Sequence, residues 1–315
     1  MAEAGWLDTP FSLEGKSVFV AGHKGLVGAA LCERLKEENC TVLTIPRSDL
    51  DLRDQATTHE WIRRNKPDVI ILAAATVGGI GANATRPADF IYDNLMIEAN
   101  VIHAAYQAGV QKLLFLGSSC IYPKFAQQPI AEDALLSGNL EDTNRAYAIA
   151  KIAGIELCQS YRRQHGCDFI AAMPCNLYGP GDRFDENASH VIPALMLKMH
   201  KAKHQVEIWG SGAPLREFLY AADLADGLLF LLKRYSHEKL VNIGSSDEIS
   251  IKDLAHKIAA VTGYDGSLVF DTDKPDGTPR KLLDSSRIQA AGWRAKTSLD
   301  EGLKKTYDWF RQHHS

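Results

Sequence analysis

Short apolar segments alternate with segments of helical periodicity through the first half of the chain. Strands are predicted at 16–21, 41–45, 68–74, 112–117 and 168–173, and helices at 26–38, 54–65, 93–108 and 144–164. The strand segments are continuous runs of Val, Ile and Leu, which is typical of strands buried on both faces. Strands separated by helices are joined by right-handed crossovers. The pattern therefore predicts an α/β fold with a doubly wound parallel sheet.

The pattern changes after the segment Tyr178–Gly181, where shorter elements begin. They are predicted at 206–209, 223–234, 240–243 and 268–270. Ser250 and Ser298 are each followed three residues later by an acid, a spacing that favours a helix start. We therefore expect residues 1–180 to form the doubly wound domain. Residues 181–315 are expected to form mainly a smaller mixed α/β domain, partly interleaved with the first.

Composition narrows the class of protein. The chain has 315 residues, 45% hydrophobic and 23% charged, which is ordinary for a globular protein. Its net charge of −4 argues against nucleic acid or an anionic membrane as a partner. No apolar run approaches the roughly 20 residues of a membrane span, and the acidic N-terminus does not resemble a signal peptide. Six cysteines without CxxC spacing indicate free thiols and a cytoplasmic location, and no metal site is expected.

Three glycines, Gly22, Gly25 and Gly28, lie between the first strand and the first helix. Glycines allow a tight turn, and the free N–H groups and dipole at a helix start can hold a pyrophosphate. A glycine turn without a ligand is the alternative. The strand–turn–helix context favours a Rossmann-type dinucleotide site. The GxxGxxG spacing resembles the short-chain dehydrogenase/reductase superfamily.

The end of the second strand indicates which dinucleotide is bound. An acid there binds a ribose diol, whereas a cation accepts a 2′-phosphate. Arg47 comes first after this strand, with no acid expected at the same place, and Lys24 adds a cation in the glycine loop. This favours NADP(H), unless Arg47 is only a solvated loop residue.

Tyr147 and Lys151 are four residues apart, which places both side chains on one face of a helix. Free tyrosine has a pKa of about 10. An adjacent lysine cation, together with the nicotinamide cation when the cofactor is oxidised, is expected to lower it. Such a pair alone is common and is usually a surface pair. Ser118, however, follows the fourth strand at the sheet edge where ligands bind. The chain thus carries a glycine loop, then a serine, then a Tyr-x-x-x-Lys pair. This order predicts a site that binds a dinucleotide and reduces a ketone.

Cys120 lies two residues after Ser118. A free thiol has a pKa of about 8.5 and can act as a base once ionised. Most buried cysteines are inert, and that alternative remains open for Cys120.

Longer blocks resemble one enzyme family. These blocks include SSCIYPK (118–124), SHVIPAL (189–195) and KPDGTPRKLLD (274–284). They are similar to the GDP-L-fucose synthases, extended short-chain dehydrogenases/reductases that act on GDP-4-keto-6-deoxy-D-mannose as 3,5-epimerases and 4-reductases. The resemblance covers nearly the whole chain. It implies an NADPH-dependent enzyme, a GDP-sugar substrate and a homodimer.

The resemblance also implies roles for individual residues. Ser118, Tyr147 and Lys151 would form the reductase triad, with Cys120 as base and His190 as acid in epimerisation. The cofactor would contact Gly22, His23, Lys24, Gly25, Leu26, Val27, Gly28, Arg47, Asp51, Leu52, Leu116, Gly117, Ser118, Ser119, Lys151, Pro174, Cys175, Asn176, Leu177 and His190. The substrate would contact Lys198, Trp209, Arg216, Asp276 and Lys281. Lys24 and Cys175 depart from the Arg and Thr that are frequent in the family.

Two other functions are compatible with parts of this pattern. Another nucleotide-sugar epimerase or dehydratase of the same branch would return its hydride to the substrate and would consume no NADPH. A non-catalytic sensor of dinucleotides would tolerate loss of Tyr147 or Lys151, and the presence of both residues argues against it.

Overall fold

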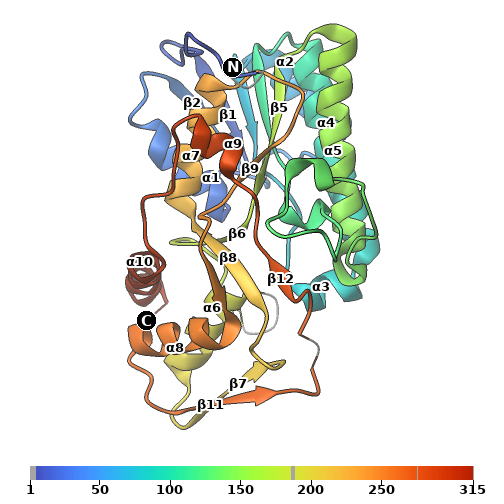
Figure 1. The fold of residues 1–315 in the computed structure, drawn as a ribbon. Coiled ribbons are helices and arrows are strands. Elements are labelled where there is room, and N and C mark those ends of the chain that lie inside the picture. Colours follow the sequence, from blue (N-terminus) through green and yellow to red (C-terminus); the bar gives the residue numbers. More distant parts are fainter. Residues whose placement is uncertain (1–4, 186–188, 275, 315) are drawn as a thin grey trace.

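The computed structural model describes residues 5–185, 189–274 and 276–314. Its largest sheet has six strands in the order β2-β1-β3-β4-β5-β9, and all neighbouring strands are parallel (Figure 1). The strands are β1 (Ser17–Ala21), β2 (Thr41–Leu43), β3 (Val69–Leu72), β4 (Lys112–Leu116), β5 (Phe169–Pro174) and β9 (Val241–Ile243). The predicted doubly wound parallel sheet is confirmed.

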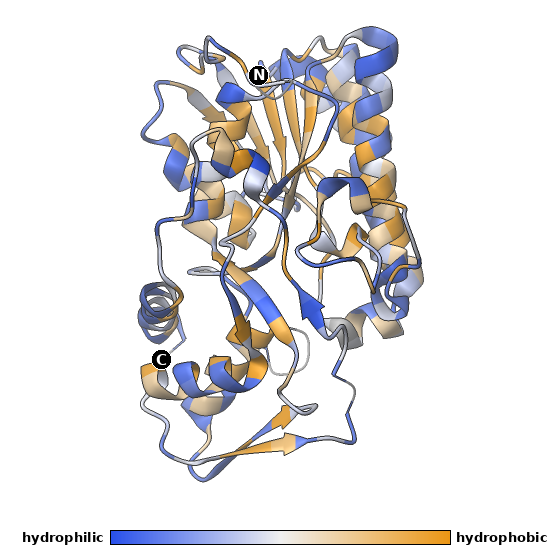
Figure 2. Ribbon diagram, viewed as in Figure 1, coloured by the Kyte–Doolittle hydropathy of each residue, from blue (hydrophilic) through white to orange (hydrophobic). Residues whose placement is uncertain are grey.

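Helices cover both faces of this sheet. Those of one face are α1 (Leu26–Leu35) and α7 (Ala221–Arg234), and those of the other are α2 (Gln55–Asn65), α4 (Pro87–Gln107) and α5 (Arg145–His165). Every residue of β3, β4 and β5 is buried, as expected for strands covered on two sides. Figure 2 shows these strands as the most hydrophobic part of the molecule.

The helix expected to begin at Asp93 begins at Pro87 instead. Proline at the first position of a helix has the required φ and loses no hydrogen bond. Asp93 and Asn94 are buried on this helix because they bind the loop after β3: Asn94 Nδ2 donates to the Thr76 carbonyl at 3.0 Å. A short helix, α3 (Ile80–Thr85), precedes α4 and was not predicted.

The second half of the chain builds smaller sheets. Strand β8 (Leu215–Tyr220) pairs with β6 (Asn176–Tyr178), β10 (Glu248–Ser250) and β12 (Arg280–Lys281), and β7 (Gln205–Trp209) pairs with β11 (Ser267–Asp271). The accompanying helices are α6 (Val191–Lys201), α8 (Ile251–Thr262), α9 (Ser286–Ala290) and α10 (Leu299–His313). Ser250 and Ser298 cap α8 and α10 through the N–H groups of Asp253 and Glu301, which confirms both predicted helix starts.

The buried hydrophobic residues form two clusters, one around the large sheet and one between α6, α8, α10 and β8. The chain crosses between them repeatedly, because α7 and β9 follow β8 in sequence but pack on the large sheet. The domain boundary near residue 180 stays a prediction. No helix in the described part of the chain has both the length and the apolar character needed to cross a bilayer.

Candidate active site

The glycine loop forms a cradle of backbone atoms. Gly22 has φ +92°, and a Cβ there would lie 2.7 Å from the Ala74 nitrogen. A Cβ at Gly28 would lie 2.1 Å from the Gly22 carbonyl oxygen. Helix α1 begins immediately after Gly25, and no described side chain caps it. Its first N–H groups are therefore available to an anion, and the loop fits the pyrophosphate of a dinucleotide.

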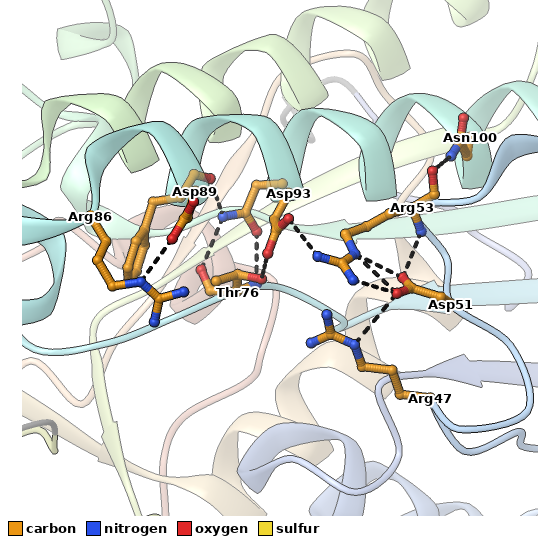
Figure 3. A network of polar contacts seen from close by, with 10 residues as sticks. Arg47, Asp51, Arg53, Thr76, Arg86, Asp89, Asp93 and Asn100 are labelled. Atoms are coloured by element: carbon orange, nitrogen blue, oxygen red, sulfur yellow. Dashed lines mark hydrogen bonds and ion pairs between the residues drawn. The ribbon is translucent and has the colours of Figure 1, made fainter.

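Arg47 follows β2, and 66% of its side chain is exposed. The expectation that no acid lies near it is wrong, because Asp51 Oδ2 is 3.8 Å from Arg47 Nε (Figure 3). Arg53 binds the same carboxylate much more closely, with Nη2 2.6 Å from Oδ2. This pairing holds the pKa of Asp51 below its usual value. Asp51 is therefore neutralised mainly by Arg53. The Arg47 guanidinium remains available to donate hydrogen bonds to a phosphate.

Arg53 also connects this loop to α4. Its Nη1 donates to Asp93 Oδ1 at 2.8 Å, and the Thr76 hydroxyl donates to Asp93 Oδ2 at 2.9 Å (Figure 3). The amide of Asn100 donates to the carbonyl of Leu52 at 3.0 Å. The segment expected to contact the adenine is thus fixed from α4.

A short 3-10 helix, η1 (Ser119–Ile121), positions Ser118 and Cys120 after β4. The Ser118 hydroxyl accepts the N–H of Cys120 at 3.3 Å. A Cβ at Gly117 would lie 2.3 Å from Met173 Sδ, so the chain turns here in tight contact with β5. Tyr147, from the first turn of α5, faces the Ser118 hydroxyl. The predicted serine and tyrosine therefore meet at the carboxyl edge of the sheet.

The expected lowering of the Tyr147 pKa by Lys151 is wrong for this structure. Burial raises the pKa of Tyr147, Cys120 and Glu98 raise it further, and only the interaction with Ser118 lowers it. The Lys151 ammonium lies 5.9 Å from the Tyr147 ring centroid and 3.0 Å from Glu98 Oε1. The carboxylate of Glu98 offsets the charge of Lys151, so Tyr147 remains protonated at neutral pH.

Cys120 faces cations from β12 and β8. Lys281 Nζ donates to Cys120 Sγ at 3.5 Å, and Lys281 is paired in register with Arg216 on the neighbouring strand. Burial lowers the pKa of Arg216, while Asp276 and Cys120 oppose that effect. Cys120 and Lys281 line one pocket together with Gln128. A thiolate formed at Cys120 would therefore face a positively charged wall.

His190 is the N-cap residue of α6. Its side chain is exposed, yet the protein around the imidazole lowers its pKa by desolvation. No contact among the described residues joins His190, Lys198 or Trp209 to Cys120 or Tyr147. Lys198 Nζ instead donates to the Glu207 carbonyl at 3.2 Å.

Trp209 ends β7, and Asp276 binds the turn that follows this strand. The Trp209 side chain is 55% exposed, and Lys274 Nζ lies 5.8 Å from its ring centroid. Asp276 accepts hydrogen bonds from the Ser211 nitrogen at 2.6 Å and hydroxyl at 2.8 Å. An exposed indole beside a lysine and a fixed carboxylate offers a flat face and hydrogen-bonding groups to a ligand.

Two buried glutamates near the site were not predicted from the sequence. Glu217 accepts the N–H groups of Ser246 at 2.7 Å and Leu283 at 3.1 Å, and burial raises its pKa to about 7. Burial and this carboxylate also raise the pKa of Cys175, which disfavours its thiolate form. Cys175 is therefore expected to line the site without reacting. Glu98 is the second, and it lies among the buried residues of α4 together with the polar Asp93, Asn94 and Asn100. No cluster of potential metal ligands occurs in the described ranges.

Comparison with known proteins agrees with this geometry. Residues 18–244 match the NAD dependent epimerase/dehydratase family. A GDP-L-fucose synthase of Sinorhizobium fredii is 58% identical over 95% of this chain and 97% of its own length. GDP-L-fucose synthase 1 of Arabidopsis thaliana is 56% identical over 95% of each chain. The solved structure of a GDP-L-fucose synthetase from Naegleria fowleri bound to NADP has a TM-score of 0.91 at 30% identity and covers 98% of each chain.

The fold and the Ser-Tyr-Lys site define a nucleotide-dependent enzyme of the extended short-chain dehydrogenase/reductase type. The chain belongs to the NAD dependent epimerase/dehydratase family, and within that family to the group of the GDP-L-fucose synthases.

Proposed function

We propose that the protein converts GDP-4-keto-6-deoxy-D-mannose to GDP-L-fucose by 3,5-epimerisation and NADPH-dependent 4-reduction. The observation that carries the proposal is Cys120 beside Ser118 and Lys281, in front of Tyr147. A simple ketone reductase needs Ser118 and Tyr147 but no thiol base. The 51–58% identical GDP-L-fucose synthases support the same assignment.

Reduction uses the residues at the edge of the sheet. Bound NADPH supplies a hydride for the C4 ketone. Tyr147 donates its proton to the carbonyl oxygen, and the Ser118 hydroxyl orients that oxygen by a hydrogen bond. The protonated state of Tyr147 that the structure favours is the state that a proton donor requires.

Epimerisation uses Cys120 and His190 on opposite faces of the sugar. The C4 carbonyl acidifies the hydrogens at C3 and C5, so a thiolate of Cys120 can remove one of these protons. Ser118 and Tyr147 hold the oxygen of the enolate, and His190 returns a proton from the other face. The Lys281 ammonium lies 3.5 Å from the sulfur of Cys120. Solvent then takes the proton from Cys120 and returns one to His190, and repetition at the second carbon inverts both centres.

The remaining predicted residues would hold the two ligands. We assign Arg216, Lys281 and Lys198 to the diphosphate, and Trp209 and Asp276 to the rest of the GDP moiety. The cofactor would lie along Gly22–Gly28, Arg47, Asp51 and Leu52, and between 116–119 and 174–177. Residues 1–180 would then bind mainly the cofactor and residues 181–315 mainly the GDP-sugar.

The test is NADPH oxidation with GDP-4-keto-6-deoxy-D-mannose, followed by identification of the sugar product. We expect one NADPH consumed for each GDP-L-fucose formed. An epimerase or dehydratase that returns its hydride would change the sugar without net NADPH loss. A dinucleotide sensor would bind NADPH and leave the sugar unchanged. Either result would overturn the proposed function.

Cofactor preference gives a separate prediction for Arg47. We expect Arg47→Ala to weaken NADPH binding and leave NADH binding nearly unchanged. A hydrogen bond to a charged group contributes about 1.5–3 kcal/mol, so the preference should fall by roughly tenfold or more. Binding is measured by titration of both cofactors, with Arg63→Ala on the exposed face of α2 as the matched control. Equal affinity of the native protein for both cofactors would contradict the assignment.

We further propose a cytoplasmic homodimer that forms through α4 and α5. These helices pack side by side (Figure 1). The side chains of Tyr92, Tyr106 and Ile149 on them are exposed. Light scattering during size-exclusion chromatography is expected to give twice the mass of the chain. A Tyr106→Glu substitution should shift the mass toward that of the monomer. If the native protein has the mass of a single chain, the proposed dimer is refuted.

A further inference from the structure

Glu98 and Lys151 form a buried ion pair beneath the proposed active site. Glu98 lies in the middle of α4, and Lys151 lies one turn after Tyr147 on α5. Lys151 Nζ is 3.0 Å from Glu98 Oε1, and each side chain is only 2% exposed. The same ammonium lies 4.7 Å from the centroid of the Phe115 ring. The Lys151 ammonium is thus held by the Glu98 carboxylate and the Phe115 ring.

The carboxylate depends on this single partner. Apart from Lys151, neither oxygen of Glu98 has a hydrogen-bond donor among the described residues. A Cβ at Gly154 would lie 2.8 Å from Glu98 Oε2, so the glycine of α5 makes room for the carboxylate. Two buried ions in contact compensate each other, whereas either ion alone is strongly unfavourable. A pair of this kind is costly to bury, and its place beside Tyr147 points to a role in the reaction.

The charged and titratable groups around the pair come from α5 and η1. Lys151 lowers the pKa of Glu98, against the larger effect of burial, which raises it. Glu98 raises the pKa of Tyr147 and of Cys158, and Cys120 adds to the effect on Tyr147. The negative charge of Glu98 therefore opposes ionisation of the phenol from the side remote from the substrate.

We propose that Glu98 is a positioning residue for the reduction: its carboxylate holds the Lys151 ammonium in place and keeps Tyr147 in its proton-donating form. This inference rests on the proposed function, because it assigns a direction to the chemistry of that site. An uncompensated lysine beside Tyr147 would favour the phenolate, the form that accepts a proton in alcohol oxidation. Lys151 paired with Glu98 still presents N–H donors, but with less net charge. The site is then suited to giving a proton to the ketone oxygen as the hydride reaches the carbonyl carbon.

The test compares Glu98→Gln with Glu132→Gln, the same change at a second, largely buried glutamate that contacts Arg287 and Asn242 and not Lys151. The pH profile of kcat for reduction is measured from about pH 6 to 10.5, the range in which cysteine and tyrosine titrate. A primary deuterium isotope effect with 4-deuterated NADPH reports the hydride step. Removal of the negative charge lowers the pKa of Tyr147, and the rate falls where Tyr147 loses its proton. The native rate should therefore hold to the alkaline end of this range, because the pKa of Tyr147 is raised, whereas the rate of Glu98→Gln should fall within the range.

The other readouts distinguish positioning from a general structural role. KM for the GDP-sugar should stay within about twofold in Glu98→Gln, because Glu98 is buried and lies beneath Lys151. The Glu132→Gln profile should keep the native limb even if its melting temperature falls. Glu98→Asp retains the charge, so its rate should hold to higher pH than that of Glu98→Gln. If Glu98→Gln does not fold, a Glu98→Asp rate that falls well below the native alkaline limit although the charge is kept overturns the inference.

A Glu98→Gln rate that holds to the same alkaline pH as the native rate would overturn the inference. Equal shifts in the Gln and Asp variants would overturn it as well. Failure of the proposed function is a different result: the native protein itself would not oxidise NADPH with GDP-4-keto-6-deoxy-D-mannose.

Discussion

Tyr147→Phe should slow NADPH oxidation by roughly 10²–10⁴-fold, the usual contribution of a positioned proton donor. The substitution removes only the hydroxyl, so the ring keeps its edge-to-face contact with Phe90, whose centroid lies 6.4 Å away. Folding and NADPH binding should be preserved. The measurement is steady-state NADPH oxidation at saturating GDP-sugar, with cofactor titration as a check on binding.

Tyr264→Phe is the matched control, because the Tyr264 hydroxyl donates to the Ser267 carbonyl at 3.2 Å after α8 and takes no part in the proposed site. Deuterium exchange at C3 and C5 should continue in Tyr147→Phe, although more slowly, because Cys120 and Ser118 remain in place. Turnover of Tyr147→Phe close to that of the native protein would exclude Tyr147 as the proton donor.

Cys120→Ser should abolish epimerisation while the protein still folds. Serine is close in size to cysteine, but its hydroxyl hardly ionises at neutral pH, whereas a free thiol has a pKa of about 8.5. No competent base would then remain beside C3 and C5. The measurement is incorporation of deuterium from heavy water at both carbons, combined with the stereochemistry of the product. We expect exchange to stop while some NADPH oxidation continues and gives the uninverted GDP-sugar.

Cys167→Ser provides the control, because Cys167 is half-buried near the far end of α5 and takes no part in the proposed site. His190→Asn is expected to differ from Cys120→Ser: proton removal persists, but return of a proton from the opposite face is impaired. Normal exchange at both carbons in Cys120→Ser would leave Cys120 as a lining residue and require another base.

The parts of the fold that sequence predicts best depend on local chemistry. Ser250 and Ser298 begin helices because each side chain caps an N–H group three residues later. The buried strands are recognisable because they are covered on both faces and need no polar residues. The start of α4 was placed too late, because the polar Asp93 and Asn94 lie inside the helix, where they bind the loop after β3.

The same distinction applies to the candidate site. Helical spacing places Tyr147 and Lys151 on one face of α5, and strand-then-loop position places Ser118 and Cys120 at the sheet edge. The contacts that adjust their chemistry come from distant segments: Lys281 reaches Cys120 from β12, and Glu98 reaches Lys151 from α4. Neither partner could be found by spacing, because each depends on how separate elements pack.

The late position of β9 in the chain has a consequence for how the protein is made. β9 pairs with β5, but it is synthesised only after α6, β7, β8 and α7. On the ribosome, the nascent sheet therefore presents the bare edge of β5 until residues 241–243 emerge. An unpaired edge recruits other strands, and pairing across so long an interval of sequence is slow. This interval is when the growing chain most needs shielding from its neighbours, and it ends only after α6, β7 and β8 of the smaller part have also been synthesised.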